Sequence, residues 1–315
     1  MSANTATRPV EYTPAPVRAP PRLVAARSCV CCASDDAEPV GVGEDFDAGL
    51  SPETFLAVRC AGCGLVYLAL RPADPAEWQR EPDAGSAGLG RGVRRQLAVL
   101  ARMLPRDGCA LEIGCGDGRR LCALRELLGP RWTIEGAEAV APADAAEAAG
   151  FHVHRGDVDE LDPECDYDLV LITDALARHG DPVGLLSAAA SRLRPGGRVV
   201  IVVENTDTAC FRLFAGRHWA GYHFPRRWYC FDARTLSSLV ARAGLRVSYL
   251  DSAADADLWV RSIRNVIADY RPSSWLAKRC GPTAVVAPAL LRVVEAAEHI
   301  RGHGALLVAA CRRAE

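Results

Sequence analysis

Apolar residues in the later two-thirds of the chain fall into short runs separated by amphipathic stretches. The runs are CALEI, WTIEGA, FHVH, YDLVLIT and RVVIVV, and the stretches between them are rich in Ala, Leu and Arg at helical spacing. Strands of a parallel sheet are covered on both faces and therefore show nearly continuous apolar runs. The alternation predicts an α/β fold, a doubly wound Rossmann-like sheet with helices on both faces.

Two more apolar runs near the C-terminus, LRVSYL and GALLVAACRR, predict two further strands. They bracket a long helical insertion at about 257–300. We expect its helices to cover the substrate entrance; a helical pair packed on the core or a dimer contact is the alternative, because the insertion is unusually apolar for a surface segment. The last strand could pair antiparallel at the sheet edge.

The chain before this sheet divides into three segments. Residues 1–27 are rich in Pro, Ala and Thr and predict a flexible tail. Residues 28–71 carry paired cysteines and predict a small domain with a core of its own. Residues 72–104 predict a Pro- and Gly-rich linker and a lead-in helix, in which Val93, Leu97, Leu100 and Leu104 share one face. The α/β domain then spans residues 105–315.

Composition narrows the class of protein. The 315 residues are 50% hydrophobic and carry a net charge of -2, so no excess of positive charge attracts nucleic acid or an acidic membrane. The thirteen scattered cysteines and the absence of a secretory apolar segment favour a reduced, cytoplasmic location. No apolar stretch is long enough to span a bilayer. Lys278 is the only lysine, which indicates GC-rich, bacterial coding. The oligomeric state is left open.

Four cysteines in the second segment have the spacing of metal ligands. Two C-x-x-C pairs occur within a short stretch, formed by Cys29, Cys32, Cys60 and Cys63. Four thiolates at this spacing suit a tetrahedral Zn²⁺ site, and a complete ligand set leaves no position for substrate. Gly64 suits the tight turn of a zinc knuckle, whereas Cys31 is spare. The segment therefore predicts a zinc ribbon with a structural metal.

The stretch LEIGCGDGRR, residues 111–120, predicts a ligand-binding turn between the first strand of the sheet and a helix. Its glycines allow the backbone to approach a ligand closely. A dinucleotide fingerprint would require a third glycine at position 119, where the chain has Arg119. An acidic residue, Glu112, precedes the glycines on the strand. Glu138 follows the second strand, with Glu135 as its rival within that strand, and GDVDEL follows the third.

The order of LEIGCGDG, EGAE, GDVDEL, YDLVLI and LRPGGRVVIVVEN resembles the class I S-adenosylmethionine-dependent methyltransferases over about residues 106–315. The resemblance implies a doubly wound methyltransferase fold that binds S-adenosylmethionine. Carried over, it assigns Glu112, Gly114, Gly116 and Gly118 to the methionine part of the cofactor, Glu138 to the ribose, and Asp157 with Val158 to the adenine.

The stretch HWAGYHFPRRWYCFDARTLSSLVARAGLRV, following a zinc ribbon and such a core, resembles a bacterial group of small-molecule methyltransferases, some of which act on sugars in natural-product pathways. Arg227 stands where that group has the His of PRH, and Ala177 with Arg178 stands where related proteins have EH. For a general base we expect His223 first and His218 second, because histidine accepts a proton near neutral pH. Tyr222 and Asp174 are the competitors.

The sequence thus predicts methyl transfer from S-adenosylmethionine to a small metabolite such as a sugar or natural-product intermediate. The first alternative is a catalytically impaired cofactor-binding or scaffold protein, suggested by the missing EH and PRH. The second is an RNA methyltransferase, suggested by the zinc ribbon and disfavoured by the absence of a basic stripe.

Overall fold

The computed structural model describes residues 22–26, 28–46, 49, 51, 53–74, 78, 89–140, 143–162, 166–270 and 288–314. Most of the expected N-terminal tail and of the linker, and residues 271–287 of the insertion, lie outside these ranges. Residues Leu23–Ala25, which were expected to belong to the tail, form strand β1 and pair antiparallel with β5 (Leu70–Pro72).

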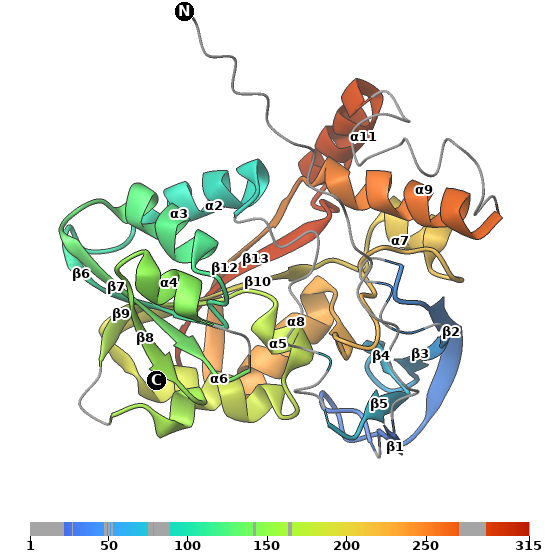
Figure 1. Cartoon of the computed structure of the whole chain (residues 1–315), viewed down its shortest axis with the longest axis horizontal. Helices are drawn as coiled ribbons and strands as arrows, with labels where there is room; N and C mark the ends of the chain where they lie inside the picture. The colour runs from blue at the N-terminus through green and yellow to red at the C-terminus, as the bar shows by residue number, and fades with distance from the viewer. Residues whose placement is uncertain are drawn as a thin grey trace, which may run out of the picture.

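A seven-stranded sheet forms the centre of the α/β part, as the apolar runs predict (Figure 1). Its order is β12-β13-β10-β9-β6-β7-β8, and the strands from β10 to β8 in this order are parallel to one another. The strands are β6 (Gly108–Ile113), β7 (Trp132–Glu138), β8 (His152–Arg155), β9 (Tyr167–Ile172), β10 (Leu193–Glu204), β12 (Leu245–Ala253) and β13 (Leu306–Arg313). The last strand is antiparallel as expected, but β12 occupies the sheet edge in its place.

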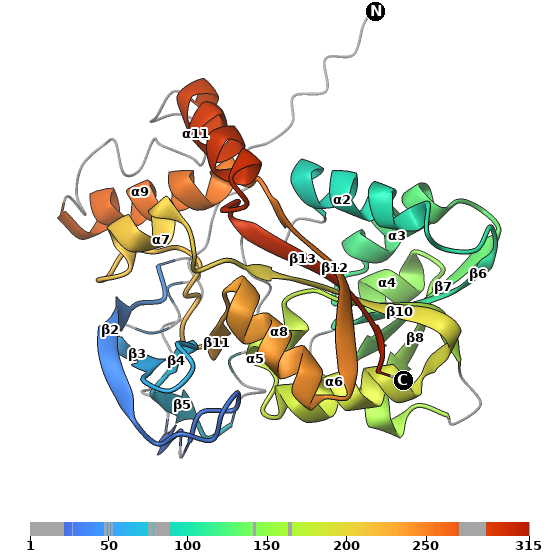
Figure 2. The same cartoon turned by 180° about the vertical axis from the view of Figure 1, so that it is seen from behind.

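Alternating side chains of the strands feed two separate cores, one on each face of the sheet. On β10, Val199, Ile201 and Val203 belong to one core, and Val200 and Val202 belong to the other. Figure 1 shows α2 and α3 on one side of the sheet and α6 on the other, and Figure 2 shows α8 beside α6 from behind. The helices that accompany the sheet are α2 (Arg91–Ala101), α3 (Arg119–Leu128), α4 (Asp144–Ala148), α5 (Ala175–Arg178), α6 (Pro182–Ser191) and α8 (Ala233–Arg242).

The insertion contributes two helices, α9 (Ala256–Tyr270) and α11 (Pro288–Ile300), which pack against each other and near α7 (Ala209–Phe214). Asp255 precedes α9, and its Oδ1 accepts a hydrogen bond from the Asp257 amide at 3.1 Å. Among the described residues, no helix combines the length and apolar character required to cross a membrane.

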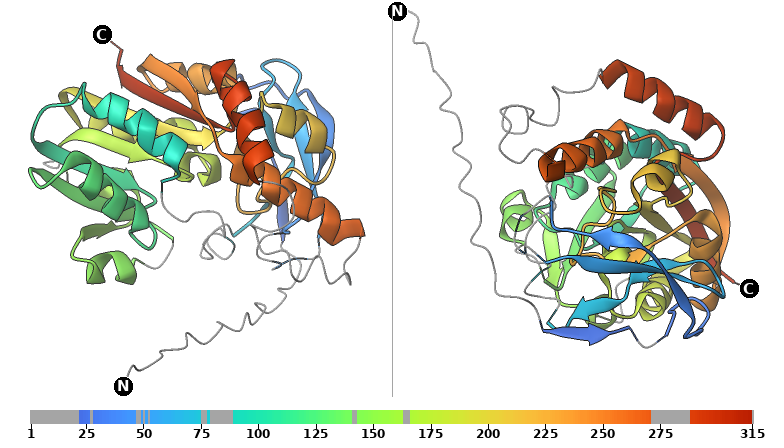
Figure 3. Two further views of the ribbon diagram at one scale, coloured as in Figure 1. Left: turned by 90° about the horizontal axis from the view of Figure 1, so that it is seen from above. Right: turned by 90° about the vertical axis from the view of Figure 1, so that its right-hand side faces the viewer.

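The cysteine-bearing segment, residues 28–71, is called the ribbon below; it folds as a small antiparallel sheet beside the α/β part (Figure 3). Strands β2 (Ala37–Gly43), β3 (Phe55–Cys60) and β4 (Val66–Leu68) pair in order, and β11 (Tyr229–Cys230) from the α/β part adds the fourth strand. One continuous core contains Phe55 and Leu65 of the ribbon together with Phe231 and Leu236. The expectation that the ribbon has a core of its own is therefore wrong, because it is too small to bury its apolar side chains alone.

Candidate functional site

The glycine-rich turn joins β6 to α3, and each of its three glycines has a positive φ. The angles are +76° at Gly114, +52° at Gly116 and +79° at Gly118, a region that side-chain-bearing residues rarely adopt. A Cβ on Gly114 would lie 3.0 Å from the Cβ of Ala175, and one on Gly118 would lie 2.7 Å from the Cβ of Ala146. A Cβ on Gly116 would meet no described atom within 4 Å. The packing of the protein thus requires two of the glycines, while the third faces open space.

Glu138, at the end of β7, is held against this turn. Its Oε2 accepts a hydrogen bond from the Gly116 amide at 2.9 Å, and its Oε1 accepts one from the Val140 amide at 3.0 Å. The rival Glu135 accepts hydrogen bonds from the Tyr167 hydroxyl at 2.8 Å and lies 2.9 Å from His154 Nε2. The structure therefore brings Glu138 to the turn and engages Glu135 elsewhere; the ribose-binding role of Glu138 stays a prediction.

Val158 begins the short 3-10 helix Val158–Glu160 after β8, and Asp157 is its N-cap. Asp157 and Glu160 form a reciprocal capping box, in which the Asp157 amide donates to Glu160 Oε2 at 3.1 Å. The Asp157 carboxylate is 55% exposed and lies 3.8 Å from His179 Nε2. Val158 is 3% exposed and packs into the core. Asp157 is accessible to a ligand, whereas Val158 is covered by protein.

Glu112 is fully buried beneath the turn and pairs with Arg120. The Arg120 guanidinium also donates to the Gly114 carbonyl at 2.6 Å and lies 3.6 Å from Asp174 Oδ2. Burial raises the pKa of Glu112 to about 7. Its Oε2 has no hydrogen-bond donor among the described residues. A buried acceptor without a donor costs about 1–3 kcal/mol, so this oxygen fits a ligand that brings a donor, such as an ammonium group.

A cavity of about 280 Å³ opens beside Arg120 at the carboxyl ends of β9 and β10. Acidic and basic side chains alternate around it. Arg227 Nη2 lies 2.7 Å from Asp174 Oδ1, and Arg227 Nη1 contacts Glu204. The lining consists of Leu89, Gly90, Val93, Arg120, Thr173, Asp174, Val202, Val203, Glu204, His223, Arg227, Asp255, Asp257, Leu258, Arg261 and Leu306. Ligands of doubly wound sheets bind at this end of the strands, so the cavity has the expected place for a substrate.

The structure separates the two histidines proposed as bases. His223 is buried, has a φ of +46° and lines the cavity, where its Nε2 lies 2.7 Å from Arg261 Nη2. A guanidinium can only donate, so Nε2 accepts, and the proton of the neutral ring is on Nδ1. His218 instead lies 2.9 Å from Asp269 and is not among the lining residues.

The two competitors for the base also differ in position. Asp174 lines the cavity between Arg120 and Arg227. The Tyr222 hydroxyl donates to the Ala215 carbonyl at 2.7 Å, and burial raises its pKa far above the ordinary range. Sequence reasoning missed Glu204, Arg261 and Asp255 as cavity residues. Glu204 ends a strand of the sheet, and Asp255 and Arg261 lie at the start of the insertion; these positions in the sequence could have indicated a place near the substrate.

The four cysteines of the ribbon meet in space. Their Sγ atoms all lie within 4.8 Å of one another, with Cys29 and Cys63 at 3.5 Å and Cys32 and Cys60 at 3.4 Å. Gly64 has a φ of +85°, and its amide donates to the Cys60 carbonyl at 2.9 Å, as a tight knuckle requires. The sulfurs are close enough to share one tetrahedral ion with bonds of about 2.3 Å. Cys31 points away and donates to the Thr235 carbonyl at 3.3 Å.

Comparison with known proteins decides the family. The family described as "Methyltransferase domain" matches residues 87–250, more than half of the chain. The chain belongs to this methyltransferase family. A search of the curated proteins found none that matches. The family match covers the glycine-rich turn and the parallel strands, and it ends before the insertion.

Several solved methyltransferase structures are similar to this one. CcbJ from Streptomyces caelestis is 17% identical, with a TM-score of 0.48 over 77% of this chain and 100% of its own. A complex of the Trm112 methyltransferase activator and a putative methyltransferase from Haloferax volcanii is 20% identical, with a TM-score of 0.49 over 71% of this chain and 90% of its own. The mitomycin 7-O-methyltransferase MmcR is 17% identical, with a TM-score of 0.45 over 70% of this chain. The match spans only about half of the length of MmcR, 54%.

Proposed function

We propose that this methyltransferase transfers the methyl group of S-adenosylmethionine to a small polar metabolite, of which a sugar or natural-product intermediate is an example. The observation that carries the proposal is the position of the cavity. It begins at Arg120 and Asp174, directly beside the glycine-rich turn, and lies outside the carboxyl ends of β9 and β10. A cofactor on the turn would therefore direct its reactive end into the cavity.

The residues at the turn fit S-adenosylmethionine. Gly116 faces open space, Glu138 presents a carboxylate at the neighbouring strand end, and Glu112 offers a buried acceptor for an ammonium group. The bound cofactor would supply an electrophilic methyl group, which leaves the protein to orient the acceptor and remove its proton where necessary. The small cavity and its charged side chains favour a compact, polar acceptor over a long polymer.

For the base, we keep His223 as the first choice, since it lines the cavity and His218 does not. It can accept a proton at Nε2 once the hydrogen bond from Arg261 is broken. The decisive variant is His223→Ala, measured in a single turnover with saturating cofactor. We expect cofactor affinity to be unchanged and methyl transfer to slow about a hundredfold or more. His218→Ala is the matched control; a rate within a few-fold of the parent for His223→Ala would shift the role to Asp174 or Asp255.

We also propose that Cys29, Cys32, Cys60 and Cys63 hold one structural Zn²⁺, which their four sulfurs would coordinate completely. Elemental analysis of reduced protein should give one zinc per chain. Cys60→Ser should lower that content, while Cys31→Ser should leave it unchanged because Cys31 faces Thr235. Absence of zinc from folded, reduced protein that was purified without a chelator would contradict the proposal.

One experiment separates small-molecule transfer from the alternatives. S-adenosylhomocysteine binding is measured by calorimetry, and cofactor carrying a labelled methyl group is then incubated with metabolite pools and with RNA. Label in a small molecule supports the proposal. Label in RNA supports a nucleic-acid methyltransferase, and tight binding without any transfer supports a cofactor-binding scaffold. Absence of cofactor binding would overturn the proposal altogether.

A further inference from the structure

The segment from Gly216 to Phe231 lies between the ribbon and the α/β part and is held by both. The Val42 amide donates to the Gly216 carbonyl at 2.9 Å, and the Leu68 amide donates to the Trp228 carbonyl at 2.9 Å. On the other side, the Trp228 amide donates to the Ala177 carbonyl at 2.7 Å. The ribbon therefore packs against one side of this segment, and the segment contributes His223 and Arg227 to the cavity lining.

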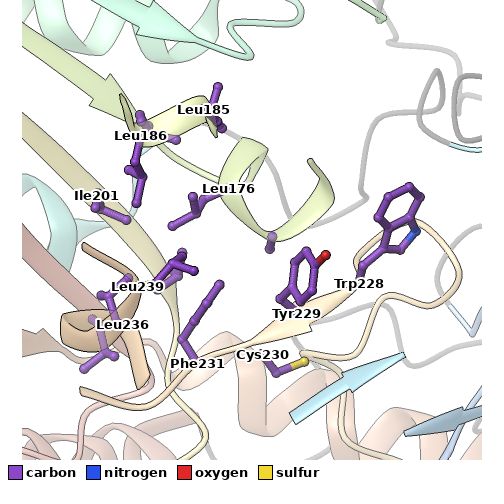
Figure 4. Packing of buried hydrophobic residues seen from close by; sticks show 14 of the residues in the cluster. Leu176, Leu185, Leu186, Ile201, Trp228, Tyr229, Cys230, Phe231, Leu236 and Leu239 are labelled. Carbon is purple, nitrogen blue, oxygen red and sulfur yellow. The ribbon is translucent and has the colours of Figure 1, made fainter. Parts of the chain in front are cut away.

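Apolar packing fixes the end of this segment. Figure 4 shows Tyr229 and Phe231 beside leucines of α5 and α8, among them Leu176 and Leu239. These side chains are at most 2% exposed. The backbone around Trp228 is thus firmly placed. The Arg226 and Arg227 amides donate to the His223 carbonyl at 2.9 and 3.3 Å, and the side chains of both arginines make charged contacts.

Arg226 and Arg227 point to opposite partners. Arg226 forms an ion pair with Asp45 of the ribbon, with Nη1 and Oδ1 3.1 Å apart and side-chain exposures of 1% and 0%. Arg227 lies in the cavity, 2.7 Å from Asp174 and in contact with Glu204. Taking both charges of the Asp45 pair out of water is costly, and an apolar pair of similar volume is often as stable, so stability alone does not require this pair.

Arg227 is connected through ion pairs to the residues beneath the glycine-rich turn. Asp174, its partner, also lies 3.6 Å from Arg120, which in turn contacts Glu112 and the Gly114 carbonyl of the glycine-rich turn. Arg227 therefore continues a line of charges that starts at the turn with Glu112 and Arg120, and it links Asp174 to Glu204 in the cavity lining. A shift of its guanidinium would change the charge pattern of the cavity without altering the turn itself.

We propose that the buried Asp45–Arg226 ion pair is a positioning device: the ribbon uses it to fix the backbone at residues 226–227 and so sets the place of the Arg227 guanidinium in the cavity. The importance of that place for substrate rests on the proposed function. Asp45 and Arg226 are positioning residues in this proposal, while Arg227 contacts the substrate. The ribbon thereby acts on the site from outside, with none of its described residues lining the cavity.

The test replaces Asp45 by Asn, which keeps its shape and removes its charge, in the full-length zinc-loaded protein. The first readout is the ¹⁵N–¹H signal of the Arg227 Nε–H group, assigned with Arg227→Lys. In the parent we expect a resolved signal, because this side chain is 4% exposed and ion-paired. In Asp45→Asn we expect the signal to shift or broaden, and Asp45→Glu should restore it. Glu44→Gln is the matched control, since Glu44 pairs with Arg217 instead.

The second readout separates this proposal from the proposed function. Affinity for S-adenosylhomocysteine should stay within about twofold in Asp45→Asn, and KM for any accepted substrate should rise at least about tenfold with a smaller change in kcat. Loss of cofactor binding by the parent would count against the function. An unchanged Arg227 signal or KM in Asp45→Asn, with cofactor bound normally, would overturn only the positioning role.

A second variant covers the case in which Asp45→Asn does not fold, because the buried Arg226 charge loses the compensating charge of Asp45. The double variant Asp45→Leu with Arg226→Met removes both charges and fills the site with apolar side chains. The positioning role predicts a displaced Arg227 signal and a raised KM in this variant as well. Parent-like values in the double variant would show that the pair serves packing alone and would overturn the proposal.

Discussion

At the scale of single residues, Gly116 is the position where protein packing and ligand binding make different demands. A side chain there meets no described atom, but it would occupy the open space beside the turn. We expect Gly116→Val to weaken S-adenosylhomocysteine binding at least about a hundredfold, or about 3 kcal/mol, in calorimetry.

Gly129→Val is the control for that measurement. Gly129 also has a positive φ, +85°, and open space around it, but it ends α3 away from the turn. Both variants should lose stability through backbone strain, about 1–2 kcal/mol at Gly116 and about 1–3 kcal/mol at Gly129, where ψ is 180°. Only Gly116→Val should lose cofactor affinity. Equal affinity in the two variants would remove Gly116 from the cofactor site.

Glu295, on α11, makes the stability of the fold depend on pH. Its side chain is buried, and its Oε2 accepts from the Asp255 amide at 3.1 Å. Burial raises the pKa of Glu295 to about 7, from an ordinary 4.5. Between these two values the unfolded chain loses the proton and the folded chain keeps it. Folding therefore becomes less favourable as pH rises from 4.5 to 7, by up to about 3 kcal/mol, and changes little from this group above 7.

Glu295→Gln should remove this dependence. Thermal unfolding should show a higher Tm for the variant than for the parent at pH 8 and nearly equal values at pH 4.5. Glu38→Gln, at an exposed position of β2, serves as the control and should follow the parent. A Tm difference between Glu295→Gln and the parent that is the same at both pH values would show that Glu295 does not titrate as expected.

Sequence reasoning is strongest for residues whose role is local. Glu138 is the last residue of its strand, and each C-x-x-C pair lies within one turn of the backbone. It is weakest for ion pairs between distant segments. Nothing near Arg227 in the sequence indicates that Asp174 and Glu204 would hold it, because those partners come from the ends of two other strands.

At the scale of elements, continuous apolar runs allow the central strands to be predicted, because a buried parallel strand needs apolar side chains on both faces. Strand β11 carries no such signal. It is two residues long and becomes a strand through pairing of Tyr229 with Tyr67 and of Cys230 with Val66. The same limit applies to β1, which is a strand because β5 offers it an edge.

Helix α9 is the element that we expect to respond to substrate. Its first turns carry Asp257, Leu258 and Arg261 into the cavity lining. Hydrogen exchange of residues 256–263 should slow when an accepted substrate and S-adenosylhomocysteine are added together, because contacts to these side chains restrain the helix. Helix α8 lines no part of the cavity and should be unchanged. Unaltered exchange in α9 would favour a helix that only packs on the core or on a second copy.

At the scale of the whole molecule, the ribbon and the α/β part share one hydrophobic core. Because of that core and the pairing of β4 with β11, we expect the two units to unfold together. The α8 helix adds contacts, since Arg242 Nη1 donates to the Cys31 carbonyl at 3.1 Å and Arg234 Nη2 donates to the Cys63 carbonyl at 2.5 Å. The spacing of cysteines predicts the knuckles but not this union, which depends on contacts between distant parts of the sequence.

Removal of the metal tests whether the shared core makes the two units unfold together. If each unit had its own core, chelation would unfold residues 28–71 and leave the remainder unchanged. Because the core is continuous, we expect the metal-free protein to show a single calorimetric transition at a lower Tm than the zinc-loaded protein, since binding energy of a structural metal is folding energy. Cys60→Ser should reproduce the shift, and Cys31→Ser, whose hydroxyl can still donate to Thr235, should not. Two separate transitions, with early hydrogen exchange confined to residues 28–71, would show instead that the shared core is not cooperative.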